Sequence, residues 1–118
     1  MPVLIIDDDA SFRTVLEHDL RQSGYMVHVS AGFESMLDVL LKGTPQTAIV
    51  DAHLPYGESR QAVMVLRRCG IPFVLLNERG APVDRWQNEN ATSEVTLTKP
   101  VGWGDLDRHL RQLRSSAP

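Results

Sequence analysis

The stretch VLIIDDD at residues 3–9 decides the fold prediction. Its four apolar residues are typical of a strand that is buried on both faces of a parallel sheet. Three consecutive carboxylates follow, and like charges this close together disfavour joint ionisation. A bound cation would relieve that repulsion. The stretch therefore predicts a buried strand whose carboxyl end lies at a cation site.

A second apolar run, residues 48–50, also ends in an aspartate, Asp51. In parallel sheets the carboxyl ends of the strands share one edge, and ligands bind there. We therefore expect Asp51 to lie close to Asp7 and Asp8. Carboxylate oxygens are the ligands that hard cations prefer, so the pattern predicts a Mg²⁺ site. The plain alternative is that each aspartate belongs to a polar turn.

Strands alternate with amphipathic helices along the whole chain. We expect strands at residues 3–7, 25–30, 47–51, 71–76 and 95–98. Apolar residues at helical spacing predict helices at residues 11–23, 33–41, 62–69 and 106–113, and a short exposed helix within 80–90. This alternation predicts an α/β fold with a parallel sheet covered by helices on both faces, formed by a single domain of residues 1–118.

Single positions carry further expectations. Ser11 is expected to cap the first helix, and Val15 to lie on its apolar face. Cys69 reads as a small core residue. Trp86 and Trp103 are interpreted as packing residues, with partner contacts as the alternative.

Composition excludes several classes of protein. An apolar fraction of 42% and a charged fraction of 23% are those of a globular, folded chain. A net charge of −3 argues against a nucleic-acid-binding role, and a cluster of arginines at 108–114 reads as a solvated helix face. The single cysteine permits no internal disulfide, which favours a cytoplasmic location. No apolar stretch is long enough to predict a membrane span.

Polar residues thus end four predicted strands: Asp7-Asp8, Asp51, Asn77 and Lys99. With Leu54-Pro55 after the third strand and Pro100 after Lys99, the chain resembles the receiver domain of two-component response regulators over essentially its whole length. The resemblance implies a doubly wound, flavodoxin-like receiver fold with five strands in the order 2-1-3-4-5.

The resemblance also implies roles for these residues. Asp51 would be the phosphoacceptor, taking a phosphoryl group from a sensor histidine kinase or phosphotransfer protein. Asp8 would bind Mg²⁺ directly and Asp7 largely through water, with Asp51 and the backbone carbonyl of His53 completing the protein ligands. Lys99 would hold an incoming phosphoryl oxygen, and its bond to Pro100 is expected to be cis. An unknown downstream protein and a homodimer are further expected partners; nucleic acid and membrane are not.

Two positions depart from the pattern of receivers. Asn77 stands where they usually carry Ser or Thr, and Thr96 stands where they usually carry Tyr or Phe. The usual hydroxyl–aromatic switch cannot operate with these residues, so non-standard output switching is expected. The amide of Asn77 could donate to a phosphoryl oxygen or could hold unphosphorylated Asp51. Ser59 replaces a common glycine.

Two other functions compete with this interpretation. The first is a receiver-fold module that binds other proteins independently of phosphorylation, which Asn77 and Thr96 favour. The second is a phosphatase, because Asp7-x-Asp9 faintly resembles the nucleophile motif of haloacid-dehalogenase phosphatases. The later acidic pair of those enzymes is missing, and the chain is not expected to be an enzyme.

Overall fold

Five parallel strands form one sheet in the order β2-β1-β3-β4-β5. The computed structural model describes residues 2–82, 85–88 and 95–116. The strands are β1 (Pro2–Ile6), β2 (Met26–Ser30), β3 (Thr47–Asp51), β4 (Phe73–Glu78) and β5 (Val95–Lys99). Strand number, direction and order confirm the predicted fold, and the third strand has the predicted bounds.

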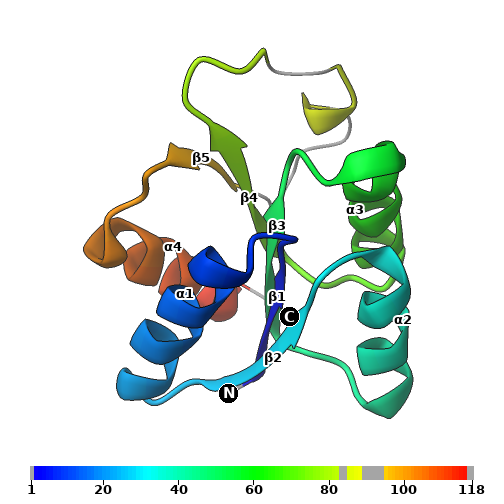
Figure 1. Ribbon diagram of the computed structural model, residues 1–118. Helices are drawn as coiled ribbons and strands as arrows, with labels where there is room; N and C mark the ends of the chain where they lie inside the picture. The colour runs from blue at the N-terminus through cyan, green and yellow to red at the C-terminus, as the bar shows by residue number, and fades with distance from the viewer. Residues whose placement is uncertain (1, 83–84, 89–94, 117–118) are drawn as a thin grey trace.

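Helices cover both faces of the sheet (Figure 1). They are α1 (Ala10–Gln22), α2 (Phe33–Lys42), α3 (Glu58–Arg68) and α4 (Trp103–Ser116), with short 3-10 helices η1 (Pro55–Gly57) and η2 (Arg85–Asn88). Helices α1 and α4 lie on one side, and α2 and α3 lie on the other. Within the described residues, no helix has the length and apolar character needed to cross a bilayer.

The side chains of β1 alternate between two hydrophobic cores, because successive residues of a strand point to opposite faces. Leu4 and Ile6 join the core beneath α2 and α3, here called the α2/α3 core. Val3 and Ile5 join the core beneath α1 and α4. All four are fully buried. This two-sided burial is the physical reason for a continuous apolar run rather than an alternating one.

The start of α1 differs from the prediction. Asp9, not Ser11, is the N-cap, and its side chain accepts a hydrogen bond from the backbone N–H of Phe12. A carboxylate at this position satisfies a free N–H and interacts favourably with the helix dipole. Val15 is 62% exposed, because the buried positions of the helix are Leu16 and Leu20.

The end of α3 also differs from the prediction. Cys69 is exposed and was expected in the core. It follows the last helical residue as the C-cap, while Leu66 takes the buried position of that turn. Gly70 then adopts a φ of +70°, a conformation that glycine reaches without steric cost. Cys69 therefore lies on the surface of the turn that follows α3.

The region between β4 and β5 is only partly as expected. A short helix was expected within residues 80–90, and residues 85–88 form η2. Residues 83–84 and 89–90 of that segment lie outside the described residues. Trp86 is half-buried against the α2/α3 core, and Gln87 is buried, so this turn is not fully exposed. Trp103 packs against the core beneath α1 and α4. Both tryptophans are therefore packing residues.

Candidate functional site

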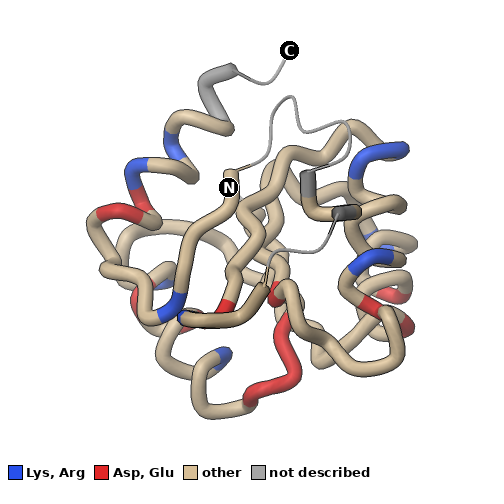
Figure 2. Tube along the Cα trace, turned by 90° about the horizontal axis from the view of Figure 1, so that it is seen from above, with Lys and Arg blue, Asp and Glu red and all other residues tan. Residues whose placement is uncertain are grey.

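Three carboxylates converge at the carboxyl edge of the sheet. Asp7 and Asp8 follow β1, and Asp51 ends the neighbouring strand β3. Each offers one oxygen, and these oxygens all lie within 4.8 Å of one another. Figure 2 looks onto this edge and shows the three consecutive aspartates after β1 as one continuous acidic stretch. The arrangement brings together the acids that the sequence selected.

One ammonium group lies among these acids. The Nζ atom of Lys99 is 3.0 Å from Asp7 Oδ2 and 3.9 Å from Asp51 Oδ1. It also lies 4.3 Å from the centroid of the Phe12 ring, within the range of a cation–π contact. Lys99 ends β5, which is separated from β3 by β4, so its long side chain reaches across one strand. Lys99 and the guanidinium of Arg13, which donates to the backbone carbonyl of Asp7 at 2.6 Å, face three carboxylates. The negative charge that remains could be balanced by a divalent cation.

The three carboxylates differ in how their oxygens are engaged. Asp7 is buried; its Oδ1 accepts the N–H of Asp9 at 2.9 Å, and its Oδ2 accepts from Lys99. Asp8 is exposed, and in the described part of the chain its carboxylate accepts no hydrogen bond. Asp8 is therefore the carboxylate most available to a cation.

Burial raises the pKa of the Asp51 carboxyl, because the charged form is poorly solvated at 4% exposure. The negative charges of Asp7 and Asp8 act in the same direction. The backbone N–H of His53, which donates to Asp51 Oδ1 at 3.0 Å, lowers the pKa, as does Lys99. Burial outweighs these contacts. Ionising Asp51 here is costly, and a nearby cation would reduce that cost.

Proteins similar to this chain in sequence or in fold are named as transcriptional regulators or response regulators. AfsQ1 of Streptomyces coelicolor, a transcriptional regulatory protein, is 29% identical over 110 residues, which are 92% of this chain and 49% of the relative. The response regulator MprA of Mycobacterium leprae is 25% identical over 115 residues, 96% of this chain and 50% of that protein. A CheY-like receiver domain protein from Methanospirillum hungatei superposes with a TM-score of 0.86 at 22% identity, over 98% of this chain and 94% of that one.

The chain is similar in sequence to response regulators and has the fold of their receiver domains. It spans about half the length of the curated relatives that it matches. No protein-family model matches it.

A buried serine braces the loop that follows β3. The hydroxyl of Ser59 donates to the carbonyl of Asp51 at 2.6 Å and accepts the N–H of Leu54 at 2.7 Å. Ser59 is 2% exposed. The sequence does not predict this role for Ser59, because no local pattern shows that the start of α3 packs against the end of β3.

The site also contains a side-chain contact that the sequence did not indicate. The ring Nε2 of His53 forms a hydrogen bond with Oδ1 of Asn77, which is the penultimate residue of β4 and follows the register partner of Asp51. Asn77 is buried, and its Nδ2 donates to the carbonyl of Ala81 at 3.5 Å. Its amide is thus held by His53 and Ala81, whereas the sequence raised the possibility of a bond to Asp51. The sequence predicts a role only for the backbone carbonyl of His53, not for its ring.

The edge strand β5 carries Thr96, the second position that departs from the usual pattern of receivers. Thr96 is exposed on β5, whose residues alternate between half-buried and exposed. The bond between Lys99 and Pro100 is cis, as expected. The amide at the end of β4 and the hydroxyl on β5 therefore lie in different surroundings, one buried and one open to solvent.

Proposed function

We propose that residues 1–118 form one domain that accepts a phosphoryl group on Asp51 within a two-component or phosphorelay pathway. The observation that supports this most strongly is the convergence of Asp7, Asp8, Asp51 and Lys99 from three strands. A stability requirement would not place three carboxylates within 4.8 Å of one another at a sheet edge, since their mutual repulsion opposes folding.

The donor set fits Mg²⁺. All candidate ligands are oxygens, and Mg²⁺ is usually held by one or two carboxylates while it keeps several waters. Asp8 has the free carboxylate, so it is proposed as a direct ligand, with Asp51 and the backbone carbonyl of His53. Both oxygens of Asp7 are engaged, which suits contact through water. When bound, the ion would neutralise negative charge on the transferred group.

The residues present can position and stabilise a phosphoryl transfer. The donor is proposed to be a phosphohistidine on a sensor histidine kinase or a phosphotransfer protein. A carboxylate oxygen of Asp51 attacks phosphorus, the new P–O bond replaces the P–N bond, and the imidazole leaves with its electron pair. Oδ2 of Asp51 accepts no hydrogen bond in the described part of the chain, so it is the available nucleophile. Lys99 supplies positive charge to a phosphoryl oxygen.

The acyl phosphate would change the charge of the surface to which partners bind. Phosphorylation adds a charge of about −1.5 to −2 at neutral pH. A downstream protein target, or a second copy of the chain, is proposed to bind the altered surface.

Incubation with acetyl phosphate and Mg²⁺ tests this function, with intact mass as the measurement. We expect the wild-type protein to gain the mass of one phosphoryl group, and Asp51→Ala to gain none. Asp8→Ala should slow the gain and weaken its dependence on Mg²⁺. Asp38 lies exposed on α2 outside the cluster, so Asp38→Ala is the matched control and should behave as wild type. A wild-type protein that gains no mass contradicts the proposal.

A second candidate is a receiver fold that binds partners without phosphorylation. The engagement of the Asn77 amide by His53 and Ala81, together with the exposed Thr96, favours it. The same mass measurement separates the two functions. Partner binding that is equal for wild type and Asp51→Ala would support the second candidate.

A further inference from the structure

His53 has contacts in two directions. Its backbone N–H donates to Asp51 Oδ1 at 3.0 Å, and its ring binds Oδ1 of Asn77. We propose that His53 is a positioning residue: its ring orients the amide of Asn77, and that amide passes the phosphorylation state of Asp51 to the loop of residues 79–82 after β4. The inference rests on the proposed function, because it assigns an output to phosphorylation at Asp51.

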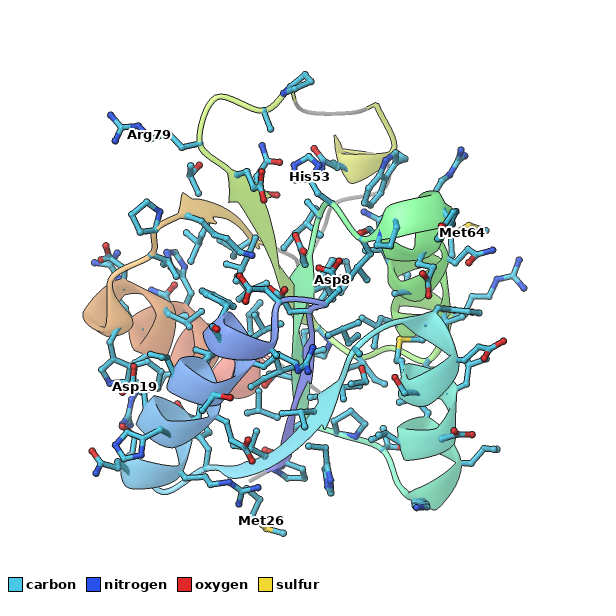
Figure 3. The ribbon with its side chains drawn as sticks, in the orientation of Figure 1. Asp8, Asp19, Met26, His53, Met64 and Arg79 are labelled. Carbon is cyan, nitrogen blue, oxygen red and sulfur yellow. The ribbon has the colours of Figure 1, made fainter. Side chains whose placement is uncertain are left out.

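The contacts form a continuous route. Asn77 receives the His53 ring at its oxygen and donates through Nδ2 to the carbonyl of Ala81 at 3.5 Å. The N–H of Ala81 in turn donates to the carbonyl of Glu78 at 3.1 Å, which closes the turn. Figure 3 labels His53 at the carboxyl edge of the sheet, above Asp8 and below the 79–82 loop. Asp51 and the loop are therefore joined through two residues, His53 and Asn77.

His53 determines which half of the Asn77 amide faces the loop. With Oδ1 held by the imidazole, the NH₂ half is the donor that remains for other acceptors. Because Asn77 is 5% exposed, water does not readily compensate for an amide that loses its partners. His53 thus keeps the Asn77 oxygen on its own side, so the NH₂ group is the half that can change its acceptor.

The bond to Ala81 is the one that a phosphoryl group would break. At 3.5 Å it is longer than an ordinary N–H···O hydrogen bond, which is about 2.9 Å. A phosphorylated Asp51 adds charged oxygens at the end of β3, one strand away from Asn77, and hydrogen bonds to charged acceptors are stronger than neutral ones. The NH₂ group is expected to move to a phosphoryl oxygen and to release the 79–82 loop.

Trp86 provides a reporter for this loop. It lies in η2, four residues after Pro82, and packs against the α2/α3 core. The chain has two tryptophans, so Trp103→Phe leaves Trp86 as the sole source of tryptophan emission. We expect phosphorylation by acetyl phosphate and Mg²⁺ to shift this emission in the Trp103→Phe protein.

Two variants at position 53 separate positioning from stability. His53→Ala removes the ring and should lose most of the shift, compared at equal phosphorylated fraction by intact mass. His53→Gln places an amide nitrogen close to the position of the imidazole Nε2, so it should restore the shift. Asn77→Ala removes the other partner and should lose the shift as His53→Ala does. Circular dichroism confirms that each variant is folded.

The outcomes are distinguishable. A shift in His53→Ala equal to that of its parent, or no rescue by His53→Gln, overturns the inference while the proposed function stands. Failure of the parent protein to take up a phosphoryl group overturns the proposed function and this inference with it.

Discussion

The centre of the sheet and its β5 edge are built differently, although both contribute to the site. The residues of β3 are all buried, as are the last four of β1, and these two strands position the three carboxylates. On β5, half-buried residues alternate with exposed ones, and this strand supplies Lys99. The three carboxylates proposed as acceptor and cation ligands therefore lie at the ends of buried strands, whereas the lysine that pairs with them comes from a more exposed strand.

The largest expected difference concerns stability in these two regions. Leu4 is fully buried in β1, and Leu97 is half-buried in β5. We expect Leu4→Ala to lower the free energy of unfolding by about 3 kcal/mol and Leu97→Ala by about 1 kcal/mol, because the fully buried site loses more contacts and leaves a larger cavity. Urea denaturation measures both. Equal losses would show that the edge strand is as restrained as the centre.

Removing the ammonium at the edge should have the next largest effect. Lys99→Met leaves buried Asp7 without its ion pair, and we expect a loss of about 2 kcal/mol in the free energy of unfolding. Added Mg²⁺ should recover part of this loss, since a cation near the carboxylates replaces the missing charge. Lys42→Met is the matched control, because Lys42 is exposed at the end of α2. Equal losses in both variants would contradict a role of Lys99 in charge balance.

The smallest expected effect is a gain in stability at the centre. The pKa of Asp51 is raised by folding, so the folded state binds more protons than the unfolded state between the ordinary and the raised pKa. Stability therefore falls as the pH rises through that window, and the cost is complete above it. Asp51→Asn removes the charge and should raise the free energy of unfolding by about 1 kcal/mol at pH 7 without divalent cations.

That gain should disappear under two conditions. Below the ordinary carboxyl pKa of about 4, Asp51 is protonated in both states, so the variant has no advantage. With Mg²⁺ present, the ionised carboxylate is stabilised and the gain should shrink. Denaturation at several pH values, with and without Mg²⁺, measures both trends. A gain that is independent of pH would show that the charge is not its cause.

Single residues show where sequence reasoning succeeded. Asp51 was placed beside Asp7 and Asp8 because buried parallel strands have a strong apolar signal and share one carboxyl edge. Ser11 and Cys69 were misplaced because a residue's position relative to the last hydrogen bond of a helix decides capping and burial. Local patterns locate such boundaries only to within a few residues.

The alternation of strands and helices and the meeting of three acids at one edge follow from the order of apolar and charged residues, so both could be predicted before the fold was known. The partners of Ser59, His53 and Asn77 instead depend on the folded arrangement of the chain. Ser59 reaches Asp51 across 8 residues of chain, and His53 reaches Asn77 across 24. Such contacts depend on how the loops after β3 and β4 pack against each other, which no periodicity encodes.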